Sequence, residues 1–186
     1  MFKKEVPPEN LIKRIIKYCP FIKELDNAYV AGGFIRSYYA REKASDMDIF
    51  FIDESSFDTA IKKISNEWEM VSHTSKAVTF VNQGKVVQFI SLLYGKEEDV
   101  LSLFDFTICS ISVNIKSNVL ILHDKFFEHL AGKELVVETL DSPFSSLLRV
   151  IKYIKKGYFI SCENLARIVL KCNDKNVYMD TGDDRY

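Results

Sequence analysis

The pattern of apolar and polar positions predicts a chain that alternates between helices and strands. Four apolar residues between positions 11 and 16 recur at helical spacing, with basic residues on the opposite side, which predicts a helix over 9–18. The same period predicts further helices over 34–41, 55–66, 97–104 and 126–131. Gly132 is expected to cap the last of them, because glycine readily adopts the left-handed conformation that ends a helix.

Shorter apolar runs rich in Val, Ile and Phe predict strands, since turn residues bound them and they are too short for helices. The predicted strands cover 29–31, 47–52, 68–72, 77–81, 86–93, 106–115, 119–122 and 135–139. Hairpin turns are expected at Asn82-Gln83-Gly84 and around Ser117-Asn118.

The composition changes after residue 141, where two apolar stripes at helical spacing predict two helices between 143 and 172. The stripes comprise Phe144, Leu147, Leu148, Ile151 and Ile154, and then Leu165, Ile168, Val169 and Cys172. We therefore expect an α+β (α/β) fold with a mixed sheet flanked by helices over 1–141. A short helical neck and a polar tail are expected over 142–186.

Composition and charge exclude several classes of protein. The chain has 186 residues, 25 Lys and Arg against 26 Asp and Glu, and 47% hydrophobic residues, an ordinary mixture for a folded domain. No apolar run approaches the roughly 20 residues that a membrane helix needs, and the N-terminus lacks the apolar core of a signal peptide. The four cysteines form no CxxC pair and no cluster with histidine. We expect reduced thiols in a cytoplasmic protein without a membrane partner. The pattern gives no indication of the oligomeric state.

Two carboxylates stand out within an apolar run. Asp46 and Asp48 are separated by one residue in SDMDIFFID, so on a strand both side chains project to the same face, about 6.7 Å apart along the chain. Two carboxylates that converge inside a sheet repel each other and lose solvation, and a divalent cation removes both problems. Magnesium favours one or two carboxylates together with substrate phosphates. A lone DxD is common, and a solvated strand end is the alternative interpretation.

Gly32-Gly33 lies upstream, between a predicted strand and a predicted helix. Paired glycines let backbone N–H groups approach a phosphate, and the positive end of the helix dipole adds to the attraction. Arg36, one turn into that helix, could reach the same anion. The alternative is a tight strand-to-helix turn beside a surface arginine. The Walker A and GxGxxG patterns are both absent from the chain.

These motifs together resemble a known family. AGGFIR at 31–36 and SDMDI at 45–49 resemble the GG-x-x-R … D-x-D signature of the polymerase-β-like nucleotidyltransferases, most closely that of CCA-adding enzymes and bacterial poly(A) polymerases. DFTIC at 105–109 is similar to the RRDFTIN segment of that branch. LRVIKY at 148–153 resembles the helical neck that follows its catalytic head. The three matches occur in the family order over about residues 28–158.

The resemblance implies a nucleotidyltransferase fold and a magnesium-dependent reaction. A nucleoside monophosphate would pass from an NTP to a hydroxyl of an acceptor, with release of pyrophosphate. The acceptor would be an RNA, for example a tRNA, or a protein. The residues it implies are Asp46 and Asp48 as catalytic residues and metal ligands, Gly32, Gly33 and Arg36 as triphosphate contacts, and Asp105 near the nucleotide sugar.

The chain also departs from the family pattern. Gln88 stands where the family usually has a third carboxylate, and its neutral amide can coordinate a cation but neither neutralises charge nor accepts a proton. Leu103 and Phe104 replace the arginines of RRDFTIN, Cys109 replaces its asparagine, and the base-reading EDxxR motif is absent at 142–146. The alternative function is therefore a nucleotide-binding or interaction module that has lost catalysis. A transferase that acts on protein or tRNA as a toxin or regulator is a third hypothesis.

Basic residues gather toward the C-terminus. Arg149, Lys152 and Lys156 share one predicted helix face, and Arg167, Lys171 and Lys175 share another. Such faces could contact RNA phosphates. A solvated outer face is the commoner arrangement and is the one we favour from the sequence.

Overall fold

A computed structural model describes residues 1–44, 46–64 and 67–174 and has at its centre a mixed β-sheet. The sheet has eight strands in the order β1-β8-β7-β2-β3-β6-β5-β4. Their bounds are β1 Phe2–Glu5, β2 Ala28–Ala31, β3 Asp46–Phe51, β4 Glu69–His73, β5 Ala77–Asn82, β6 Lys85–Tyr94, β7 Ile111–Asn114 and β8 Val119–His123. The β3–β6 pair is parallel, and the other neighbouring pairs are antiparallel.

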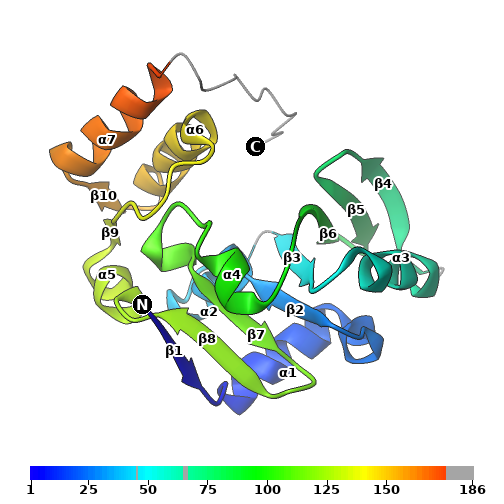
Figure 1. Ribbon diagram of the computed structural model, residues 1–186. Helices are drawn as coiled ribbons and strands as arrows, with labels where there is room; N and C mark the ends of the chain where they lie inside the picture. The colour runs from blue at the N-terminus through cyan, green and yellow to red at the C-terminus, as the bar shows by residue number, and fades with distance from the viewer. Residues whose placement is uncertain (45, 65–66, 175–186) are drawn as a thin grey trace.

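Helices surround the sheet and extend beyond it (Figure 1). Their bounds are α1 Glu9–Tyr18, α2 Gly33–Tyr39, α3 Glu54–Lys63, α4 Glu97–Leu101, α5 Phe126–Gly132, α6 Pro143–Ile154 and α7 Cys162–Cys172, with 3-10 helices at Pro20–Glu24 and Thr107–Cys109. A small parallel pair joins β9 (Glu134–Leu135) to β10 (Phe159–Ile160). Figure 1 shows α6 and α7 together at one end of the molecule, above α5 in this view and away from the β4–β5 hairpin. Among the residues described, no helix combines the length and apolar character that a membrane span needs.

The two faces of the sheet are covered differently, and this difference positions the polar side chains. One face packs against α1, α2 and α3 through side chains such as Val30, Ile49 and Phe89. The opposite face carries Ala31 and Phe50 and is covered in part by α4. Successive side chains of a strand alternate between faces, so Asp46 and Asp48 lie on the face of Phe50. The expected α+β fold with a mixed sheet flanked by helices is confirmed.

The predicted neck, from residue 142 onward, contacts the predicted head, residues 1–141, through a separate apolar cluster. Phe106, Ile108 and Val137 of the head pack against Val150 and Tyr153 of α6. The apolar stripe seen in the sequence is not the face that α6 buries, because its members Leu148, Ile151 and Ile154 are about half exposed. The helix instead buries Pro143, Ser146, Val150 and Tyr153. The division of the chain at 141/142 stays a prediction.

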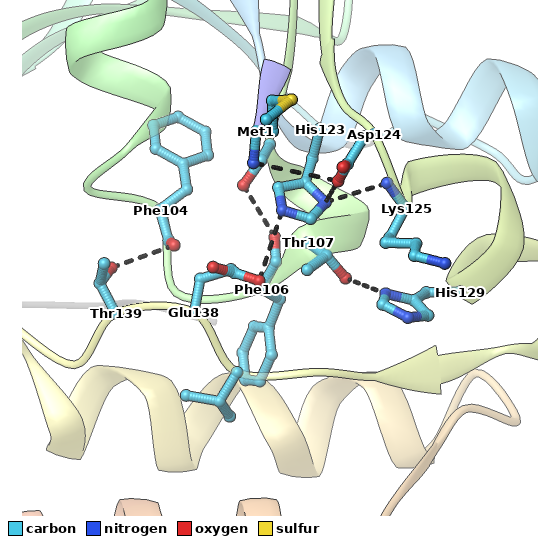
Figure 2. Close-up of polar contacts among 12 residues, drawn as sticks. Met1, Phe104, Phe106, Thr107, His123, Asp124, Lys125, His129, Glu138 and Thr139 are labelled. Carbon is cyan, nitrogen blue, oxygen red and sulfur yellow. Dashed lines mark hydrogen bonds and ion pairs between the residues drawn. The ribbon is translucent and has the colours of Figure 1, made fainter. Parts of the chain in front are cut away.

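Hydrogen bonds also fasten the segment that leads into the neck (Figure 2). Glu138 donates its backbone N–H to the Asp105 carbonyl at 2.9 Å, and its carboxylate lies 3.4 Å from Nε2 of His123. The Thr139 hydroxyl donates to the Phe104 carbonyl at 3.1 Å. The segment between head and neck is therefore held to the head by side chains and backbone alike.

Several predicted elements differ from the observed ones for identifiable reasons. The strand predicted over 106–115 begins only at Ile111, because residues 107–109 form a 3-10 turn whose apolar side chains face the neck. Lys133, with φ 51°, adopts the left-handed conformation expected of Gly132, which is still helical. The strand predicted over 135–139 is reduced to β9. The helix predicted over 55–66 ends at Lys63, and residues 65–66 lie outside the described residues. The sequence analysis did not predict β1 or β10.

The ion pair between Arg36 of α2 and Glu42 also contacts the neck. The Arg36 guanidinium donates to Glu42 at 2.9 Å and to the Tyr158 hydroxyl at 2.8 Å, and it lies over the Tyr153 ring at 5.0 Å. Lys156 of the neck lies 3.6 Å from the same Glu42 carboxylate. Burial alone would raise the pKa of Glu42, but the charge of Arg36 and the hydrogen bond from it lower that pKa below its usual value.

We predict that Glu42→Gln destabilises the protein at pH 7 by about 1–3 kcal/mol, because the buried guanidinium loses its ionic partner. The folded-state pKa of Glu42 is depressed, so its stabilising effect is complete above the ordinary glutamate value of about 4.3. The difference between the wild type and Glu42→Gln should therefore shrink as the pH falls through that value. Urea unfolding at pH 7 and pH 3.5 measures it, with exposed Glu24→Gln as control. An equal difference at both pH values would contradict the prediction.

Candidate functional site

Strand register brings the predicted acidic residues beside one another. Asp48 is the cross-strand partner of Ala31 on β2 and of Gln88 on β6, and Asp46 is the partner of Val86. Cross-strand partners lie on the same face of a sheet. Asp46, Asp48 and Gln88, which are all partly exposed, therefore share one face of two adjacent parallel strands.

The Asp48 carboxylate is in an unfavourable place for a negative charge. Burial, and after it the neighbouring charge of Asp46, raise its pKa to about 6. The positive charges of Arg149 and Lys152 on α6 act in the opposite direction. The neck helix therefore places two cations near the carboxylate pair of the head.

Gln88 lies next to Asp48, at the position where the family resemblance implies a third carboxylate. Its Nε2 lies 3.5 Å from Oγ1 of Thr79, the cross-strand partner on β5. Because the amide nitrogen of Gln88 donates a hydrogen bond to Thr79, its carbonyl oxygen is the atom that can coordinate a cation or accept a hydrogen bond. The sequence analysis missed Thr79, which only the β5–β6 register identifies.

The glycine turn lies at the same end of β3 as Asp46. Gly32 follows Ala31, the partner of Asp48, and adopts φ 79° and ψ −135°, a conformation open to glycine and strained for other residues. Its N–H donates to the Ile111 carbonyl at 2.9 Å. Gly33 begins α2, whose first-turn N–H groups have no partner within the helix.

Arg36 is placed differently from the sequence expectation that it reaches an anion. Its side chain is 3% exposed, and Glu42, Tyr158 and Tyr153 surround the guanidinium. The enclosed guanidinium therefore forms part of the contact between head and neck. In this arrangement it does not extend to a phosphate beside the glycine turn.

Asp105 also contacts the neck. Its two carboxylate oxygens accept hydrogen bonds from the Ser146 hydroxyl at 2.9 Å and from Arg149 at 3.1 Å. Asp105 is 7% exposed, so its charge is balanced inside the protein by Arg149. These contacts account for both oxygens that the resemblance would direct to a nucleotide sugar.

Three residues of the basic helix faces also contact residues of the predicted head. Arg149 binds Asp105, Lys156 lies beside Glu42, and Arg167 donates to the Val137 carbonyl at 2.8 Å. Burial of Val150 and Tyr153 turns this side of α6 toward the head, which the apolar stripe alone does not indicate. Lys175 lies outside the described residues.

The donor atoms at the site fit magnesium. Two carboxylates two residues apart, with a burial-raised pKa at Asp48, form an anionic pair that a small divalent cation would relieve. Across residues 1–44, 46–64 and 67–174, no three His, Cys, Asp or Glu side chains gather as a metal cluster. Magnesium commonly binds one or two carboxylates together with substrate phosphates, which is the ligand set that Asp46 and Asp48 could take part in.

Comparison with solved structures assigns the class of fold. The chain superposes on a CCA-adding enzyme in complex with CTP with a TM-score of 0.66 at 18% identity, over 92% of this chain and 46% of that one. Thermotoga maritima CCA-adding enzyme complexed with tRNA gives 0.64, with the same identity and coverage. The Bacillus stearothermophilus enzyme with CTP gives 0.60 at 15% identity, over 84% and 42% of the two chains. The protein thus has the nucleotidyltransferase fold of CCA-adding enzyme heads, which confirms the resemblance.

The sequence comparisons identify the family. Residues 4–133 match the model of the Gabija anti-defense 2 family, and the chain belongs to that family. "Gabija anti-defense 2" of Bacillus phage SPbetaL7 is 32% identical over 155 residues, which are 82% of this chain and 39% of that protein. The chain therefore spans less than half the length of the relative and of the solved structures that it matches.

The glycine turn yields a prediction with a matched control. A Cβ at Gly32 would lie 3.4 Å from Cε2 of Phe104, and the backbone there has φ 79°, whereas a Cβ at Gly33 meets nothing within 4 Å. Gly32→Ala should destabilise the protein by about 1–3 kcal/mol, and Gly33→Ala should be near neutral. Thermal or urea unfolding measures both. Equal destabilisation by the two substitutions would disprove the assigned role of the positive φ.

Proposed function

We propose that this protein is a magnesium-dependent nucleotidyltransferase that moves a nucleoside monophosphate from an NTP to a hydroxyl of a protein or RNA acceptor. The observation that supports this most is the register that places Asp46, Asp48 and Gln88 on one face beside the Gly32-Gly33 turn. Anionic ligands for a cation and backbone donors for phosphates come together there.

Each group at the site has a role in the proposed reaction. Asp46 and Asp48 hold magnesium, which when bound orients the triphosphate, offsets its charge and lowers the pKa of the attacking hydroxyl. The first-turn N–H groups at Gly33 bind phosphate oxygens. The acceptor oxygen bonds to the α-phosphorus as the bond to the bridging oxygen breaks. Pyrophosphate leaves, and the hydroxyl proton passes to water.

The family suggests where the acceptor belongs. Its name, Gabija anti-defense 2, describes an activity against a defence called Gabija. We propose that the acceptor is a component of that defence and favour a protein over an RNA. The EDxxR motif that selects the incoming base in CCA-adding enzymes, as the resemblance implies, is absent here, so the choice of nucleotide is not expected to follow theirs.

One observation favours a second candidate function, a nucleotide-binding module without catalysis. Gln88 offers an amide where a third carboxylate was expected, and Arg36 and Asp105 are engaged in the contact between head and neck. Such a module would bind an NTP and occupy a partner without transferring a nucleotide.

Labelled nucleotides test the transferase directly. We expect α-phosphate label from one of the four NTPs to enter a macromolecule in extracts of cells that carry the Gabija defence, with magnesium present. Asp46→Asn and Asp48→Asn should each reduce labelling at least 100-fold, as expected for loss of metal ligands. Sensitivity of the product to protease or to RNase identifies the acceptor.

Asp58→Asn is the matched control, since Asp58 is an exposed carboxylate on α3. Its labelling should equal that of the wild type. Labelling that survives both Asp46→Asn and Asp48→Asn would refute the transferase assignment. Nucleotide binding without any labelled product would favour the binding module.

Gln88→Glu tests whether the missing carboxylate limits metal binding. A third negative charge next to Asp48 should tighten magnesium binding by about 10-fold, the equivalent of about 1.4 kcal/mol. Magnesium titration followed by calorimetry measures the change, with Gln88→Ala as the comparison that removes the side chain. Unchanged or weaker magnesium binding by Gln88→Glu would contradict a metal site at this face.

A further inference from the structure

Helix α6 presents one face to the head, and that face carries basic side chains. Ser146 and Arg149 bind Asp105, and one further turn along the helix Tyr153 is buried and Lys156 approaches Glu42. Residues three and four apart occupy the same side of a helix. Lys152 lies three residues after Arg149 within α6, so it belongs to this face.

Side-chain contacts connect this face of α6 to the carboxylate pair. Phe104, which lies beside Gly32, has its ring centroid 5.7 Å from that of Phe50, on the sheet face of Asp46 and Asp48. The next residue, Asp105, binds Arg149, so this face of α6 approaches the carboxylate pair. Lys152 is half-buried, whereas Lys155, which caps the C-terminal end of α6, is exposed. The two lysines therefore differ in their exposure to solvent, and Lys155 serves as the comparison for Lys152.

We propose that Lys152 binds the phosphate groups of the nucleotide, from the side of the site opposite Asp46 and Asp48. This inference rests on the proposed function and deepens it, because it assigns the triphosphate a contact from the neck. The NTP would then lie between β3 and α6, with the metal-binding carboxylates on one side and the ammonium group on the other.

Charge and anchoring both favour this arrangement. Arg36, the basic residue nearest the glycine turn in sequence, is enclosed by Glu42 and the neck tyrosines. A triphosphate carries more negative charge than one divalent cation offsets, so a further cation at the site stabilises it. Lys152 supplies that charge from a helix which Asp105, Ser146 and Arg149 hold in place. The ammonium group on a flexible stem can follow phosphates of differing geometry.

Calorimetric titration of the full chain with magnesium and each of ATP, CTP, GTP and UTP tests the proposal. For the NTP that binds most tightly, Lys152→Gln should weaken binding about 10-fold, the usual scale for one charged hydrogen bond. Lys155→Gln should stay within 2-fold of the wild type. The corresponding nucleoside monophosphate should be affected less than the triphosphate, and magnesium tripolyphosphate should lose affinity as the NTP does.

Two further variants separate a phosphate contact from a structural effect. Lys152→Arg keeps the charge and should recover most of the affinity, and its unfolding curve and that of Lys152→Gln should match the wild type. Equal NTP binding by Lys152→Gln and Lys155→Gln, together with weak binding by Asp48→Asn, would overturn the neck contact and leave the proposed function standing. A wild type that binds no NTP with magnesium would overturn both.

Discussion

The mutual repulsion of two carboxylates on an interior strand is the constraint on which the arrangement of the rest of the site depends. Asp46 and Asp48 share a face of β3, and burial raises the pKa of Asp48 to about 6. A fold that keeps such a pair must supply positive charge nearby. Here it comes from Arg149 and Lys152 of the neck, and a magnesium ion is the natural further source.

The neck can supply that charge only because the head holds it firmly. Asp105 uses both carboxylate oxygens to bind Ser146 and Arg149, and the enclosed Arg36 joins Glu42 to the neck tyrosines. Residues that the motif comparison assigns to the nucleotide thus fix the position of α6 relative to β3. In this protein, Arg36 and Asp105 of the family motifs also form the contact between head and neck.

Much of the fold and half of the site could be predicted from the sequence, for a physical reason. Strand alternation is local, so the shared face of Asp46 and Asp48 follows from their spacing, and the Gly32-Gly33 turn follows from its flanking pattern. Contacts between distant segments are not local. Nothing near Arg36 in the chain indicates its enclosure by Tyr158. The face that α6 buries against the head includes the polar Ser146, which an apolar stripe does not indicate.

The substitution at residue 88 separates the two candidate functions on physical grounds. An amide oxygen coordinates a cation but adds no charge, so the cation at this site would be held more weakly without substrate than with it. Phosphates of the NTP would then complete the coordination, and metal and nucleotide would bind together. Lys152 fits that dependence, because its positive charge would help to hold the triphosphate that brings the metal. A glutamine in place of a carboxylate at position 88 is thus compatible with a site at which the metal binds together with the nucleotide.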